Sequence, residues 1–223
     1  MRVRPGSATL KKLENTSITI NSQSFRLTRH IAERYHEALH ERKVFFEGLR
    51  VASGDPAVVK LRVQLNPALV ERPRDRPVKI DWAKDVFCKE YRALQDCEDI
   101  GFTPLFYGSE ELRQGWEYEF PGGYLNVIAM LRVPGSVTLD MEDLTENEQL
   151  LIKRQLTVIL ENIRLRGWEF LDPSPDKVLF DRDAGQTYLG GLGGIDEVNQ
   201  AYTEPITESS TVVWMFGTNI WRW

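Results

Sequence analysis

Two apolar runs on either side of a short turn constrain the fold of this chain more than any other feature. Residues 43–51 (KVFFEGLRV) and 57–65 (AVVKLRVQL) are rich in β-branched and aromatic side chains, and Ser53-Gly54-Asp55-Pro56 separates them with turn residues. Such side chains favour extended backbone, and a connection this short allows the two runs to pair only antiparallel. The segment therefore predicts a β-hairpin.

Other parts of the chain also have the alternation of apolar and polar residues that is typical of strands. After a polar lead-in of residues 1–16, the pattern predicts one strand over 17–31 and two or three more between 102 and 133. Two further strands are expected near the C-terminus, over 178–181 and 187–195, with a turn at Asp183-Ala184-Gly185.

Two segments have the periodicity of amphipathic helices. Residues 82–101 form the first, and residues 144–167 form the second, which has a capping-box pattern at Thr145 and Glu148. Gly167 suits the end of the second helix, and its apolar face is expected to contain Leu151, Leu156, Ile159, Leu160 and Ile163. Strands and helices are segregated along the chain, so the order of elements predicts an α+β fold.

The composition is that of a globular protein. The 223 residues are 42% hydrophobic and 27% charged, which fits one large domain or two small lobes. A net charge of −5 gives no electrostatic case for nucleic acid as a partner. The proline-rich, charged residues 66–81 are interpreted as a solvated surface loop, although their arginines could also form a basic patch.

The cysteines and the N-terminus bear on localisation. Cys88 and Cys97 lie in one expected helix, about 13 Å apart and beyond disulfide reach, so both are expected to be reduced thiols. The N-terminus is too polar for a signal peptide, and no run of 18 apolar residues occurs. We therefore expect a soluble protein of the cytoplasm or nucleus, without a membrane partner.

The three histidines give only a weak metal signal. His30, His36 and His40 lie close together in the sequence, but a zinc site would need further ligands, and only glutamates are near. They are interpreted as part of a surface helix or loop. No Gly-x-Ser-x-Gly or Cys-x-x-Cys motif occurs, so hydrolase and redox functions lack support.

A carboxylate-bearing loop follows the second helix. In GWEFLDPSPDKVLFD (residues 167–181), Asp172 and Asp176 stand in a proline-rich turn directly before an apolar strand. Aspartates are common turn residues, but catalytic carboxylates are also often found on loops beside rigid elements. Both interpretations fit this segment alone.

The order of these segments resembles the protein-kinase-like fold, which also includes the aminoglycoside and choline phosphotransferases. The resemblance covers about residues 25–200 and rests on AVVKLRV, FCKEYRALQDC, YLNVIAMLRVPG, GWEFLDPSPDKVLFD and GGIDEVNQA. It implies that Lys60 reaches the nucleotide phosphates and that Glu90 forms an ion pair with it. It also implies a hinge at which backbone groups from Met130 to Arg132 bind adenine.

The resemblance assigns the remaining site residues as well. Asp172 matches the catalytic aspartate that accepts the proton of the substrate hydroxyl, and Asp196 matches the aspartate that binds the metal ion. Lys177 replaces the metal-binding asparagine and could instead neutralise phosphate charge, while Arg164 and Phe170 replace two histidines. ATP and Mg²⁺ are the implied cofactors.

Several departures from the family pattern argue against catalysis. The segment AERYHEALHE, where a glycine-rich phosphate loop belongs, contains no glycine, and Lys177 places a cation where magnesium needs an oxygen ligand. Few residues follow Asp196, and the tail with Trp214, Trp221 and Trp223 could cover the exposed face of a shortened lobe. We therefore expect an N-lobe over 17–134 and a shortened C-lobe over 135–223.

The functional hypothesis is a kinase-like protein with weak or no phosphoryl transfer, a pseudokinase that acts through binding. One alternative is an active ATP-dependent protein or small-molecule kinase that uses Asp172 as its base. Another is an interaction domain that binds no nucleotide. The sequence does not identify the partner, which is expected to be a protein or a small molecule.

Overall fold

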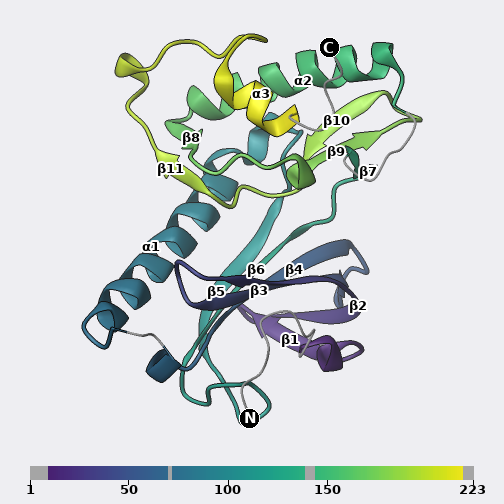
Figure 1. The fold of residues 1–223 in the computed structure, drawn as a ribbon. Helices are drawn as coiled ribbons and strands as arrows, with labels where there is room; N and C mark the ends of the chain where they lie inside the picture. Colours follow the sequence, from purple (N-terminus) through teal and green to yellow (C-terminus); the bar gives the residue numbers. More distant parts are fainter. Residues whose placement is uncertain (1–9, 70–71, 139–143, 218–223) are drawn as a thin grey trace. The chain divides into compact units, whose positions relative to one another are not determined.

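The computed structural model describes residues 10–69, 72–138 and 144–217. The chain divides into two compact units. One contains the chain up to Phe87 together with Phe106–Arg132, and the other contains Cys88–Leu105 together with the chain from Val133 onward. Helices and mostly antiparallel strands occur together, so the fold is α+β (Figure 1). The assignment of residues 17–134 and 135–223 as kinase lobes stays a prediction.

The first unit is built on a six-stranded antiparallel sheet (purple to teal in Figure 1). Its spatial order is β1-β2-β3-β4-β6-β5. The predicted hairpin is confirmed as β3 and β4, which pair from Glu41↔Gln64 to Leu49↔Pro56. The strands are β1 (Ser17–Ile20), β2 (Gln23–His36), β3 (Glu41–Arg50), β4 (Pro56–Gln64), β5 (Phe106–Arg113) and β6 (Tyr124–Leu131).

Alternate residues of these strands build the core of the first unit. Successive side chains of a strand point to opposite faces of the sheet, so every second residue reaches the same core. On β4 these residues are Ala57, Val59, Leu61 and Val63, all at most 1% exposed. They pack with alternate residues of the neighbouring strands, namely Phe25, Leu27, Val44, Phe46, Leu125, Val127 and Ala129.

The structure corrects the prediction of a single strand over 17–31. Asn21 and Ser22 have φ angles of 48° and 63°, and this left-handed pair turns the chain back, so that β1 and β2 form a hairpin. β2 then continues to His36. His30 and His36 therefore lie on a strand, and their interpretation as part of a helix or loop is wrong, whereas His40 lies in the following turn.

The lead-in and the charged insert are also more ordered than expected. Residues 1–9 lie outside the described residues, but Leu10 is 1% exposed and belongs to the sheet core, followed by a 3₁₀ turn, η1 (Lys11–Leu13). The insert contains η2 (Pro67–Leu69), and helix α1 (Asp75–Asp96) already begins within it. The surface-loop interpretation is thus wrong for residues 75–81. Lys79 Nζ donates to Ala38 O at 2.9 Å, which ties the start of α1 to the β2–β3 turn.

Helix α2 (Glu146–Arg164) of the second unit begins as the sequence predicts. Thr145 accepts from the backbone N–H of Glu148, and the Glu148 side chain accepts from Thr145, so the capping box is confirmed. The buried face differs at one position, because Leu151 is partly exposed and Ile152 takes its place. The buried apolar residues are Ile152, Leu156, Ile159, Leu160 and Ile163.

The second unit also contains short strands. One sheet has the order β10-β9-β7, and a separate pair joins β11 to β8. The strand predicted over 187–195 is interrupted by a glycine-rich loop, so it becomes two strands in different sheets. The strands are β7 (Ser136–Val137), β8 (Trp168–Phe170), β9 (Val178–Asp181), β10 (Gln186–Leu189) and β11 (Ile195–Glu197).

The remaining elements are short. They are η3 (Glu98–Ile100), η5 (Pro175–Lys177), η6 (Gln200–Tyr202) and helix α3 (Thr211–Gly217). α3 packs beside α2 (yellow and green in Figure 1). Trp214 of the predicted covering tail lies on α3, with Lys153 Nζ 4.0 Å from its ring centroid, whereas Trp221 and Trp223 lie outside the described residues. Among the helices that the structure describes, none is long and apolar enough to cross a bilayer.

Candidate functional site

The loop after β8 is held against the glycine-rich loop that precedes β11. The backbone N–H groups of Leu171 and Asp172 both donate to Gly194 O, at 2.9 and 3.1 Å. Gly194 has a φ of +81°, and a Cβ there would lie 2.9 Å from the Asp172 Cβ. Only glycine fits this conformation and this close approach without strain. The fold thereby brings the predicted base, Asp172, next to the loop that leads to Asp196.

Lys177 joins the same two segments. Its Nζ donates to Asp172 O at 2.5 Å and to Gly193 O at 2.8 Å, and it lies 5.5 Å from the centroid of the Phe170 ring. Hydrogen bonds from a charged donor are stronger than neutral ones, so these contacts fix the ammonium in place. In this structure Lys177 stabilises the two loops by binding their carbonyl oxygens.

Asp196, the predicted metal ligand, forms an ion pair with a lysine. β11 pairs with β8 so that Asp196 lies opposite Glu169. The Asp196 Oδ1 lies 2.8 Å from Lys89 Nζ of α1 and also accepts the Glu197 N–H at 2.8 Å. Burial alone would raise the pKa of Asp196, but the Lys89 ammonium and the Glu197 N–H outweigh it and lower that pKa below its usual value.

Asp172 differs from Asp196 in its surroundings. Its side chain is exposed, and within residues 10–69, 72–138 and 144–217 its carboxylate forms no hydrogen bond or salt bridge. Asp176, the other aspartate of this loop, accepts a hydrogen bond from Ser174 Oγ. The two aspartates of the loop thus differ in that a neighbouring side chain donates to Asp176, and the role of Asp172 as a base stays a prediction.

The predicted nucleotide-binding residues of the first unit lie on the sheet. Lys60 is buried on β4, 4% exposed, with its Nζ 5.4 Å from the centroid of the Phe45 ring. Met130 is buried on β6, and Arg132 just after it pairs with Glu47 Oε1 at 3.0 Å. Glu90 is buried on the part of α1 that belongs to the second unit. The ion pair between Lys60 and Glu90 stays a prediction.

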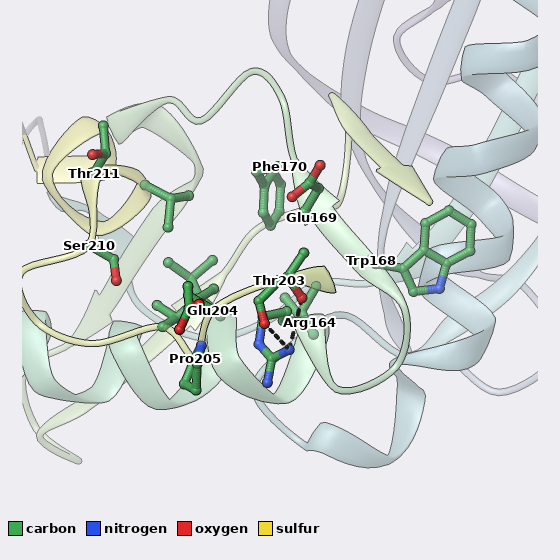
Figure 2. A pocket seen from close by; sticks show the side chains of 13 residues that line it. Arg164, Trp168, Glu169, Phe170, Thr203, Glu204, Pro205, Ser210 and Thr211 are labelled. Carbon is green, nitrogen blue, oxygen red and sulfur yellow. Dashed lines mark hydrogen bonds between the residues drawn. The ribbon is translucent and has the colours of Figure 1, made fainter. Parts of the chain in front are cut away.

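Arg164 and Phe170, which stand where the family has histidines, help to form a cavity in the second unit. The Arg164 guanidinium donates to Glu161 Oε1 at 2.7 Å and to Thr203 Oγ1 at 2.9 Å, as Figure 2 shows for Thr203. The Phe170 ring meets the ring of buried Phe216 edge to face, with centroids 5.0 Å apart. Both positions therefore contribute to the packing of α2, β8 and α3.

Three of these features were missed at the sequence level. Lys89 was not identified as a partner of Asp196, Gly194 was not recognised as a contact of Asp172, and the cavity was not foreseen. Lys89 directly precedes the predicted Glu90, but nothing in the local pattern indicates that Lys89 contacts Asp196. Among the described residues, no group of three or more His, Cys, Asp or Glu side chains is placed to hold a metal ion.

No protein-family model and no curated protein sequence matches this chain. Among solved structures, it is similar to vaccinia related kinase 3, with a TM-score of 0.52 and 13% identity over 82% of this chain and 52% of that one. It is also similar to the BubR1 kinase domain, with a TM-score of 0.53 and 12% identity over 84% of this chain and 52% of that one. The chain thus spans about half the length of either kinase structure. The fold is kinase-like.

Proposed function

We propose that this kinase-like protein acts by binding a partner and transfers phosphoryl groups weakly or not at all. The observation that carries the proposal is the position of two lysines. Each of the two residues that the family resemblance assigns to metal binding is engaged by an ammonium group or replaced by one: Lys89 binds Asp196, and Lys177 stands in place of the asparagine.

Magnesium would have to compete with these contacts. The ion needs several oxygen ligands in near-octahedral geometry, and it binds proteins mainly through carboxylates. To reach Asp196, it would have to displace a lysine at 2.8 Å, and it would then meet the positive charge of Lys177 beside Asp172. Without the metal ion, the charge that develops on the transferred phosphoryl group loses its main stabilisation.

The active kinase is the second candidate. The exposed carboxylate of Asp172, which forms no salt bridge within the described part of the chain, favours it, because a general base must be free to approach the substrate hydroxyl. In that case Lys60 and Lys177 would neutralise phosphate charge, with Asp196 on magnesium.

Phosphoryl transfer is the direct test. We expect no Mg²⁺-dependent ATP consumption by the wild-type protein above the level of the Asp172→Ala variant. Calorimetric titration with ATP, with and without Mg²⁺, separates the remaining hypotheses. Binding without turnover supports the pseudokinase, and no binding at millimolar ATP supports the interaction domain without nucleotide. Metal-dependent ATP consumption that Asp172→Ala abolishes would establish the active kinase instead.

A metal titration tests separately whether Lys89 keeps a metal ion from Asp196. Mn²⁺ broadens NMR signals near its site, and we expect no selective broadening around Asp196 in the wild type. Lys89→Ala removes the competing ammonium and should produce broadening at Asp196 and Glu197. Lys84→Ala is the matched control, because Lys84 also lies on α1 but pairs with Glu111 at 3.4 Å. Selective broadening at Asp196 in the wild type would contradict the proposal.

A further inference from the structure

The cavity of the second unit has no part in the phosphoryl-transfer test proposed above. It has a volume of about 270 Å³ and lies between the end of α2, strand β8 and the segment that leads into α3 (Figure 2). Glu204, Pro205 and Thr211 of its lining are exposed, so it is open to solvent on that side.

The interior of the cavity is apolar. Leu160 and Ile163 of α2 are each 1% exposed, and Phe170 is fixed by its edge-to-face contact with Phe216. Ile206 completes the apolar wall, and its backbone N–H donates to Glu161 Oε2 at 2.8 Å. Covering such a surface with another apolar group removes it from water and lowers the free energy.

The polar lining has an excess of negative charge. The single guanidinium, Arg164, is already paired with Glu161. Glu169 and Glu204 also line the cavity, and neither carboxylate forms a hydrogen bond or a salt bridge within the described residues. The lining thus contains two carboxylates and one guanidinium, and that guanidinium is already paired with Glu161 outside the lining. An incoming cation would therefore be attracted to Glu169 and Glu204.

The size of the cavity selects the kind of occupant. A cavity of about 150 Å³ holds a benzene-sized molecule, whereas sites for drug-sized ligands begin at about 300 Å³. A volume of about 270 Å³ therefore suits one large aromatic side chain with its local backbone. Aromatic side chains buried in pockets of this kind dominate many protein interfaces.

We propose that this cavity binds an aromatic side chain of a partner protein, in a segment where arginine or lysine flanks the aromatic residue. The aromatic ring fills the space beside Phe170, Ile163 and Ile206, and the flanking cations pair with Glu169 and Glu204. The inference rests on the proposed function, in which the protein acts through a partner, and it names the chemistry of the partner segment.

Peptide titration of the ¹⁵N-labelled full chain tests the proposal. The probes are the acetylated and amidated tripeptides Arg-Trp-Arg, Arg-Ala-Arg and Glu-Trp-Glu, with tryptophanamide as a small aromatic ligand. We expect Arg-Trp-Arg to shift the amide signals of residues 163–170 and 203–212. Loss of the aromatic ring should weaken binding by more than about tenfold, and Glu-Trp-Glu should bind more weakly still.

Two charge variants of the same segment provide the matched comparison. Glu204→Lys places a cation in the lining and should weaken Arg-Trp-Arg by about two- to fivefold, as expected for an exposed ion pair. Glu208→Lys makes the same change outside the lining, where Glu208 lies 3.8 Å from Arg154, and should leave the affinity unchanged.

Several results would overturn the proposal. They are the absence of shifts with Arg-Trp-Arg, shifts confined to residues outside the cavity, and equal effects of the two charge variants. Tryptophanamide binding as tightly as the tripeptide would indicate a small-ligand site instead. These readouts are independent of ATP consumption, so failure of the cavity proposal and failure of the proposed function are distinguishable.

Discussion

The two units differ in how they hold their charged groups. In the first unit, Arg62 on β4 and Glu41 on β3 form a bidentate pair at 1% and 0% side-chain exposure, and Tyr124 OH also donates to Glu41. In the second unit, Lys89 and Asp196 pair at 23% and 33% exposure, and Lys177 binds backbone carbonyls. The buried pair of the first unit is part of its core, whereas water and ligands can reach the contacts of the second.

This difference matters for function. A buried charge without its partner is strongly destabilising, so Glu41 and Arg62 are committed to each other. A half-exposed pair contributes little to stability and can exchange partners at low cost. A ligand could therefore displace the Lys89–Asp196 contact without unfolding the second unit. The predictions below compare buried and exposed contacts.

The largest effect is expected for Glu41→Gln. It removes the negative charge beside buried Arg62, and the loss of one member of such a pair costs about 3–5 kcal/mol. Urea unfolding monitored through the first unit measures this cost. Glu47→Gln is the control, because its partner Arg29 is 64% exposed, and it should cost less than about 1 kcal/mol. Equal losses in the two variants would show that burial of the Glu41–Arg62 pair does not set it apart from an exposed pair.

Phe216→Leu should destabilise the second unit by about 2 kcal/mol, because it removes the edge-to-face contact with Phe170 and leaves a small void. Hydrogen exchange of the α2 amides measures the change. Met215→Leu, at the neighbouring and partly exposed position, should stay within about 0.5 kcal/mol. A smaller loss in Phe216→Leu than in this control would show that the second unit is not organised around this contact.

The cap of α2 makes the stability of the second unit depend on pH. The Arg182 guanidinium, followed by the Thr145 N–H, lowers the pKa of Glu148 from 4.5 to about 2. Because the folded pKa is the lower one, this stabilisation is present in full above pH 4.5 and is lost as the pH falls towards 2. Unfolding of wild type and Glu148→Gln, followed by circular dichroism, should therefore differ most near neutral pH and converge in acid. A constant difference would contradict this explanation.

The smallest effect concerns cysteine reactivity in the second unit. Burial raises the pKa of the Cys97 thiol to about 12, whereas Cys88 is only partly buried. The thiolate is the reactive form, so iodoacetamide should label Cys88 on the order of tenfold faster than Cys97 in the native protein. Mass spectrometry of timed samples measures the two rates, and denatured protein serves as the control. Comparable native rates would show that the C-terminal end of α1 opens readily.

The sequence predicted most reliably where local pattern and tertiary environment agree. The hairpin of β3 and β4 follows from β-branched residues around a turn, and the start of α2 follows from Thr145 and Glu148. It failed where a short signal was ambiguous. Asn21-Ser22 carries no glycine, so its turn was missed, and the start of α1 was hidden by the prolines and charges that precede Trp82.

The candidate site shows the same limit. Asp172, Lys177 and Asp196 were identified through a resemblance, and the structure brings the loops of all three together around Gly193 and Gly194. The ion pair of Asp196 was not predictable, because its partner Lys89 is distant in the sequence. One of the two acceptors of Lys177, Asp172 O, lies in its own loop, whereas the other, Gly193 O, comes from a loop farther along the chain.

The sequence by itself determined the alternation of strands, the helix cap, the α+β order and the position of Asp172 in a loop before the strand at 178–181. These features depend on backbone preferences and on side chains a few residues apart, so a local pattern contains them. Only the tertiary structure decided that Lys89 pairs with Asp196 and that Gly194 lies against Asp172. It also decided that α2, β8 and the segment leading into α3 line a cavity. Such contacts join distant segments, and they form only once packing has brought those segments together.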